Sequence, residues 1–155
     1  MKANFDGAVF ADSGEAGVGF VIQNENGEVM AALSEKIALP SSVEVLEMVA
    51  ARRAAVFAAE LGFQRVIFEG DAAGVIKALS MRELALALAG HLVKDFMFIA
   101  GSLRTFSFSH TRRQDNNVAH ALVKGASFFF FYKFGWRIFH LTFYIMLLKI
   151  FQLNK

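Results

Sequence analysis

The sequence has no cysteine and a single proline among its 155 residues. The lack of cysteine excludes a disulfide scaffold, a Cys-ligated zinc or iron–sulfur centre and thiol catalysis, and it is typical of a reducing compartment. The first residues also lack the apolar stretch of a signal peptide. We therefore expect an intracellular protein, in the cytoplasm or the nucleus, rather than a secreted one.

Charge is scarce and unevenly distributed. Only 19% of the residues are charged and 55% are hydrophobic, which excludes a disordered chain and allows a sizeable core. Residues 1–125 contain 12 Lys and Arg and 14 Asp and Glu, whereas residues 126–155 contain four basic residues and no acidic one. The basic pI therefore belongs to the C-terminal residues and does not by itself indicate a nucleic-acid-binding surface.

The composition changes near Gly125, and 11 of the 21 aromatic residues lie beyond it. We expect one domain over residues 1–126 and a hydrophobic, aromatic-rich tail over 127–155. Insertion of the tail into a membrane is near break-even, because Arg137 and Lys133 offset its apolar side chains. Three interpretations stay open: a membrane-associated segment, a helix docked on the domain or a partner, and translation past the natural end of the domain. The abrupt change favours the third.

The hydrophobic pattern predicts a series of strands and helices. An Asn-Gly turn at residues 26–27 joins two of the strands, and a capping box of Ser41 and Glu44 starts a helix that ends near Leu61, with Gly62 as its C-cap. The predicted strands cover residues 3–10, 19–23, 28–37, 63–69 and 103–109. The predicted helices cover residues 41–61, 72–79, 83–100 and 118–124, with a polar loop over 112–117.

This order of elements determines the fold class. Three hairpin-linked strands form an antiparallel meander, and the two later strands are separated by helices, so they pair in parallel with right-handed crossovers. The sequence therefore predicts an α/β fold: a five-stranded mixed sheet flanked by helices.

Three acidic residues occupy positions from which their carboxylates could act together. Asp6 lies within a strand, Glu47 one turn into a helix, and Asp71 at the end of a buried strand. Taken singly, they suit a surface position, a helix-dipole contact and an N-cap. If the first and fourth strands are neighbours, the three carboxylates converge and can hold divalent cations.

Three separated regions carry a resemblance to a known family. The segments are residues 4–8 (Asn-Phe-Asp-Gly-Ala), 16–22 and 26–27, then 47–58 and 60–71, then 110–113, 116 and 119–122. Together they resemble the ribonuclease H family in its plant, retroelement-associated form, over about residues 1–126. The resemblance implies the ribonuclease H-like fold.

The resemblance also implies a function: hydrolysis of the RNA strand of RNA–DNA hybrids by an endonuclease that uses two Mg²⁺ ions. Asp6, Glu47 and Asp71 match three of the four acidic metal-binding positions. Glu44 is an alternative to Glu47, but the distance along the sequence to Asp71 favours Glu47. The fourth falls on His120, where the family most often has Asp. We expect this change to weaken metal binding or to shift the preference toward Mn²⁺, because imidazole is a poor Mg²⁺ ligand. Asp115 is a weak candidate for compensation.

The closing motif supplies the remaining candidates. His110 matches a mobile histidine that assists proton transfer or product release. Arg112, Arg113 and Asn116 are the expected nucleic-acid contacts. The expected partner is an RNA–DNA hybrid or another nucleic acid, and we expect a monomer. The alternative function is a catalytically inactive nucleic-acid-binding domain with the same fold.

Overall fold

The computed structural model of the protein describes residues 1–82 and 89–126. The tail over 127–155, with its three interpretations, lies outside the described residues, and so does the first part of the helix predicted over 83–100. Within the described ranges, no helix is both long and apolar enough to span a membrane.

The described residues form one five-stranded sheet with helices on both faces. The strands are β1 (Lys2–Phe10), β2 (Glu15–Gln23), β3 (Val29–Ala38), β4 (Arg65–Gly70) and β5 (Thr105–His110). The helices are α1 (Val43–Glu60), α2 (Ala73–Met81), α3 (Gly90–Ala100) and α4 (Asn117–Ala126), with a 3-10 turn η1 (Arg113–Asn116) before α4.

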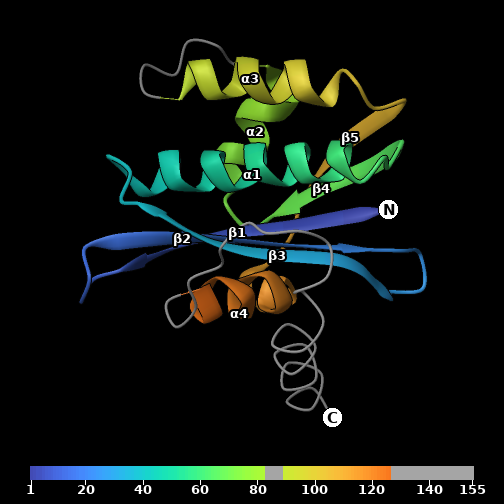
Figure 1. The fold of residues 1–155 in the computed structure, drawn as a ribbon. Helices are drawn as coiled ribbons and strands as arrows, with labels where there is room; N and C mark the ends of the chain where they lie inside the picture. Colours follow the sequence, from blue (N-terminus) through green and yellow to red (C-terminus); the bar gives the residue numbers. More distant parts are fainter. Residues whose placement is uncertain (83–88, 127–155) are drawn as a thin grey trace.

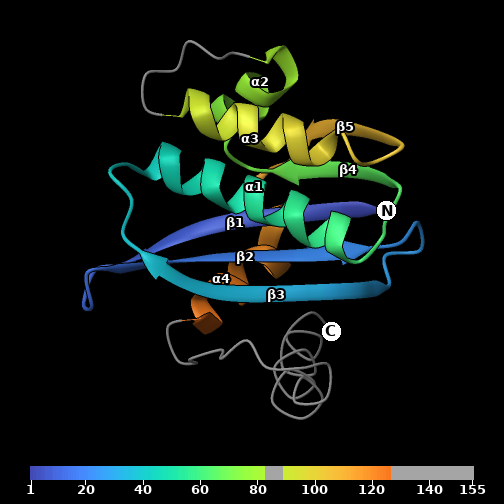
Figure 2. The same cartoon turned by 45° about the horizontal axis from the view of Figure 1, so that its top comes forward.

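The strand order is β3-β2-β1-β4-β5, which Figure 2 shows across the sheet. The β1–β2 and β2–β3 pairs are antiparallel, and the β1–β4 and β4–β5 pairs are parallel. The predicted five-stranded mixed sheet flanked by helices is therefore confirmed. Strand β4 pairs with β1 on the side opposite to β2. The end of β4 therefore lies beside the central strand of the sheet.

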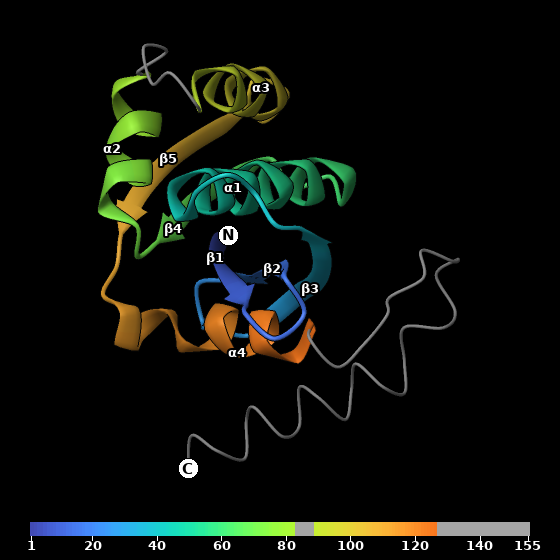
Figure 3. The same ribbon diagram turned by 90° about the vertical axis from the view of Figure 1, so that its left-hand side faces the viewer.

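The helices are divided between the two faces. Helices α1, α2 and α3 lie on one side, and α4 lies on the other, against β1, β2 and β3 (Figures 1 and 3). The core between the sheet and the first three helices is rich in phenylalanine, and the rings of Phe68 and Phe96 meet edge to face at 5.0 Å.

Small residues let α1 lie close to the sheet. Five of its buried positions are alanine: Ala50, Ala51, Ala54, Ala55 and Ala58. On β1, a Cβ added at Gly7 would lie 2.7 Å from Leu46 Cγ, which is closer than real Cβ atoms approach. The absence of a side chain at Gly7 therefore allows the start of α1 to pack directly on β1.

The predicted capping box was wrong. Ser42, not Ser41, is the N-cap of α1, and its hydroxyl accepts a hydrogen bond from the Val45 amide at 3.2 Å. The N-cap lies one residue later than predicted, so the third helical position is Val45, which offers no carboxylate to complete the box.

Two loops are more regular than predicted. The predicted polar loop over 112–117 contains η1, and α4 already begins at Asn117. Strand β2 begins at Glu15 rather than at residue 19. Glycine weakens a strand prediction made from sequence. Gly19 is nevertheless required here, because an added Cβ would lie 2.8 Å from the Val123 amide nitrogen and 3.0 Å from the Ala119 carbonyl oxygen of α4.

We expect Gly19→Ala to destabilise the protein by about 1–3 kcal/mol, since the new methyl group meets backbone atoms that cannot move aside. Gly74→Ala is the matched control: it lies in α2 with open space around its added Cβ, and it should be neutral or slightly stabilising. Urea unfolding of both variants measures the difference, and equal midpoints would contradict the close approach of α4 to β2.

Candidate active site

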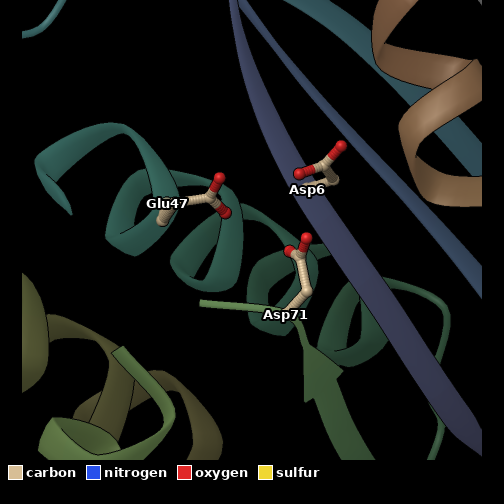
Figure 4. A group of neighbouring side chains, drawn as sticks. All are labelled: Asp6, Glu47 and Asp71. Atoms are coloured by element: carbon tan, nitrogen blue, oxygen red, sulfur yellow. The ribbon is translucent and has the colours of Figure 1, made fainter. Parts of the chain in front are cut away.

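The backbone brings three carboxylates together. Asp6 lies in β1, Glu47 on α1 beyond its first turn, and Asp71 directly after β4. The parallel register of β1 and β4 ends with the pair Asn4 and Glu69, and Asp6 and Asp71 each follow two residues later on their own segment. One ligand oxygen from each of the three carboxylates lies within 4.8 Å of the other two. Figure 4 shows the three side chains facing one another from β1, α1 and the end of β4.

This acidic cluster (Asp6, Glu47 and Asp71) is largely buried. Asp6 is 3% and Glu47 8% exposed. Burial, followed by the charges of Asp6 and Asp71, raises the pKa of Glu47 to about 8. Burial also raises the pKa of Asp6, against the opposing effect of a hydrogen bond from His120. Three negative charges in a poorly solvated place repel one another and favour protonation, unless a cation joins them.

An unpartnered oxygen indicates where a cation fits. Glu47 Oε2 is buried and has no hydrogen-bond partner among the described residues. Such an atom is costly in an apolar surrounding, and a bound cation would satisfy it. The donor set consists of carboxylate oxygens, which suit hard divalent ions. The cluster therefore fits a divalent metal ion.

His120 contacts the cluster without belonging to it. Its Nδ1 lies 2.6 Å from Asp6 Oδ2, and α4 carries it to this place. Among the described residues, the group whose ligand atoms meet within 4.8 Å consists of the three carboxylates alone. Asp115 is exposed on η1 and is not in that group either, so the structure gives no support to its compensating for His120.

The expected histidine and arginines lie between the end of β5 and the start of η1. His110 ends β5, and its Nε2 lies 3.2 Å from the carbonyl oxygen of Asp71, to which it can donate in the Nε2-protonated tautomer. Arg112 and Arg113 are exposed at the start of the following turn. Burial dominates the raised pKa of Asp6, and the guanidinium of Arg113 opposes it. Arg113 is therefore near enough to act on the cluster electrostatically.

Asn116 is buried at the end of η1. It is 2% exposed, and its Nδ2 donates to the Phe5 carbonyl oxygen at 2.8 Å. Its Oδ1 accepts from Asn4 Nδ2 at 3.3 Å. These internal bonds hold η1 to β1. The expected contact of Asn116 with nucleic acid stays a prediction.

Two further polar residues beside the cluster, Asn4 and Glu69, were not predicted from the sequence as site residues. Asn4 Nδ2 donates to Glu69 Oε2 at 2.8 Å. Their signal was the strand period of two, since Asn4 precedes Asp6 and Glu69 precedes Asp71 by two residues each, but the pairing depends on a register that spacing alone does not give.

Comparison with known proteins identifies the family. Residues 4–126 match the family model described as reverse transcriptase-like. The chain belongs to this ribonuclease H-like family. No curated protein sequence matches it.

Solved structures agree on the fold. Ribonuclease H1 from the halophilic archaeon Halobacterium salinarum is 26% identical, with a TM-score of 0.74 over 81% of this chain and 96% of that one. LC11 ribonuclease H1, isolated from compost and solved in complex with an RNA/DNA hybrid, is 24% identical, with a TM-score of 0.65 over 81% and 94%. A foamy viral protease–reverse transcriptase with an RNA/DNA hybrid is 15% identical, with a TM-score of 0.67 over 82% of this chain and 20% of that one. The narrower plant retroelement origin stays a prediction.

The raised pKa of Glu47 predicts a pH-dependent stability in the absence of metal. The folded state keeps the Glu47 proton up to pH about 8, whereas the unfolded state loses it near the ordinary value of 4.5. The unfolded state therefore binds fewer protons between these values, and the free energy of unfolding should fall as the pH rises through this window.

Thermal unfolding in EDTA across this range tests the effect. Glu47→Gln has no proton to lose, so its Tm should fall less steeply with pH than that of the parent. Glu44→Gln on the exposed side of the same helix removes the same kind of charge and should keep the parental slope. Parallel curves for Glu47→Gln and the parent would contradict the burial of an uncompensated carboxylate.

Proposed function

We propose that the protein is a divalent-metal-dependent endonuclease that hydrolyses the RNA strand of RNA–DNA hybrids. The observation that carries the proposal is the buried cluster of Asp6, Glu47 and Asp71 within a ribonuclease H-like fold. Two of the similar solved structures hold RNA/DNA hybrids, which supports a hybrid as the ligand here.

The three carboxylates would hold the metal, with Mg²⁺ as the proposed ion and Mn²⁺ as its substitute. Two such ions would supply activation of the attacking water and stabilisation of the leaving 3′ oxygen, and the products would carry a 5′-phosphate and a 3′-hydroxyl. Because the pKa of Glu47 is raised to about 8 mainly by burial, this side chain gives up a proton when it becomes a ligand near neutral pH.

The surrounding residues orient the carboxylates and the substrate. His120 holds the Asp6 carboxylate through the 2.6 Å contact, but it brings no negative charge of its own to the cluster. Arg112 and Arg113 are exposed before and at the start of η1 and would bind phosphates of the hybrid. His110, next to the Asp71 carbonyl, would move a proton toward the leaving group or assist product release.

A second candidate function is a nucleic-acid-binding domain without catalytic activity. The observation that favours it is His120 in contact with Asp6, where the resemblance leads one to expect a fourth carboxylate. One fewer negative charge lowers the attraction for Mg²⁺, and imidazole is a poor substitute ligand for that ion. The two candidates differ in whether the remaining carboxylates suffice.

Cleavage of a labelled RNA–DNA hybrid by the full chain separates them. We expect cleavage that is faster in Mn²⁺ than in Mg²⁺, and a loss of at least about a hundredfold in Asp71→Asn, as is usual when a group that stabilises transition-state charge is removed. His120→Asp should increase the rate in Mg²⁺. An inactive parent together with an active His120→Asp would favour the binding domain, and activity that survives in Asp71→Asn would contradict the assigned site.

Metal should also stabilise the folded protein. A ligand that binds only the native state at about 100 times its Kd adds about 2.7 kcal/mol to the free energy of unfolding. We expect the Tm to rise with Mn²⁺ in the parent and in the surface control Glu44→Gln, but not in Asp71→Asn. A Tm that does not respond to Mn²⁺ or Mg²⁺ would contradict the metal centre without any assay of cleavage.

A further inference from the structure

A polar network lies beside the acidic cluster and is not part of it. Its members on the sheet are Asn4 on β1, Glu69 on β4 and Ser109 on β5. The strand registers pair Asn4 with Glu69 and Glu69 with Ser109, so the three side chains form one row across the sheet. Asn116, at the end of η1, joins the row from outside the sheet.

The bonds of the network converge on Glu69 and on β1. Glu69 Oε2 accepts from Asn4 Nδ2 at 2.8 Å and pairs with Lys2 Nζ at 3.1 Å, while Oε1 accepts from Ser109 Oγ at 3.1 Å. Asn4 Nδ2 also reaches Asn116 Oδ1 at 3.3 Å, and Asn116 Nδ2 donates to the Phe5 carbonyl oxygen at 2.8 Å. The carboxylate therefore connects three strands and the turn before α4.

Each member stands next to a component of the candidate site. Asn4 and Phe5 precede Asp6, Glu69 precedes Asp71 by two residues, and Asn116 lies between Arg113 and His120. Asn4 is 5% exposed. Glu69 accepts from Asn4 and Ser109 and pairs with Lys2, and it is absent from the acidic cluster.

A sheet does not require such a network to hold together. Buried amides and carboxylates cost free energy unless every bond is made, and apolar side chains of similar size often stabilise as well or better. What a polar network adds is direction, because hydrogen bonds fix distances and angles that apolar contacts leave loose. Here the hydrogen bonds fix the positions of the β1 and β4 residues that precede Asp6 and Asp71.

We propose that Asn4, Glu69 and Asn116 are positioning residues of the metal centre: they fix β1 against β4, and so Asp6 against Asp71, and they hold the turn that carries Arg113 and leads to His120. The inference rests on the proposed function in so far as that function places a metal ion at the acidic cluster. Residues that orient metal ligands from outside typically change metal affinity by about 10–100-fold when they are replaced.

A double substitution distinguishes positioning from plain structural support. Asn4→Leu alone leaves Glu69 short of a donor and should lower the Tm. Asn4→Leu combined with Glu69→Leu replaces the pair by apolar side chains, and stability should recover relative to the single variant, because no carboxylate is left unpaired. If the network positions the cluster, affinity for Mn²⁺ stays low in the double variant although its Tm recovers.

The readouts are Tm in EDTA and Mn²⁺ affinity by calorimetry, on the full chain without nucleic acid. We expect Mn²⁺ affinity to fall by at least about tenfold in the double variant. Glu35→Gln is the matched control, since it removes the acceptor of the Arg53 ion pair between β3 and α1, and it should leave Mn²⁺ affinity unchanged. Glu69→Gln keeps the side-chain shape and should show the same loss of Mn²⁺ affinity. It replaces the double variant if the protein with Asn4→Leu and Glu69→Leu does not fold.

The outcomes separate the inference from the proposed function. Mn²⁺ affinity within about twofold of the parent in the folded variants would overturn the positioning role. A parent that binds Mn²⁺ but cleaves no hybrid would overturn the proposed nuclease and leave the positioning role intact. A parent that does not bind Mn²⁺ would overturn both.

Discussion

The mutual repulsion of three carboxylates in a poorly solvated place is the constraint on which this structure depends. Asp6 and Glu47 are almost fully buried, and Asp71 is held beside them. Burial and like charges together disfavour ionisation, as the raised pKa of Glu47 shows. A protein keeps such an arrangement only if the surrounding structure enforces it. Here β1 lies between β2 and β4 at the centre of the sheet. Because Gly7 has no side chain, Leu46 at the start of α1 packs directly on this strand.

The enforcement comes from both faces of the sheet. On one face, the small alanine side chains of α1 let the helix pack closely on the sheet, and Glu47 lies on this buried side of the helix. On the other face, α4 lies against β2 close to Gly19 and delivers His120 to Asp6. The row of Asn4, Glu69 and Ser109 then joins the strands that carry Asp6 and Asp71. The polar residues near the cluster thus have separate tasks, and proximity alone does not make each of them a ligand.

The sequence was sufficient for the fold class and for the three carboxylates, for identifiable reasons. Strand and helix periodicities are local, so the order of elements could be predicted, and parallel pairing after a helical crossover follows from general topology. The convergence of Asp71 with Asp6 depended on the fourth strand lying beside the first, which the sequence left as a condition and the β1–β4 pairing fulfils. The capping residue of α1 was missed because Ser41 and Ser42 are adjacent, and only packing decides which of them begins the helix.

The burial of Asn116 and the start of β2 were missed for a different reason. Both depend on how α4 and the turn before it meet the sheet, and this is a long-range contact that leaves no periodic signal. Gly19 resembles a loop glycine until the Ala119 carbonyl and the Val123 amide are placed above it. Asn116 resembles a surface residue of a polar motif until Phe5 and Asn4 supply its partners.

His120 shows how one residue alters the balance of the whole cluster. A carboxylate at this place would add a fourth negative charge beside Asp6. Without metal, that charge would add to the burial and the repulsion that together raise the pKa of Glu47. An imidazole removes this charge and donates to Asp6 when Nδ1 is protonated, so it relieves the metal-free fold. The same change lowers the attraction for a divalent ion, because the electrostatic field that repels the carboxylates from one another is the field that binds the cation. Stability without metal and affinity for metal are therefore coupled with opposite signs at this position, and a chain with His120 is expected to fold more readily without metal and to bind Mg²⁺ less tightly than one with a fourth carboxylate.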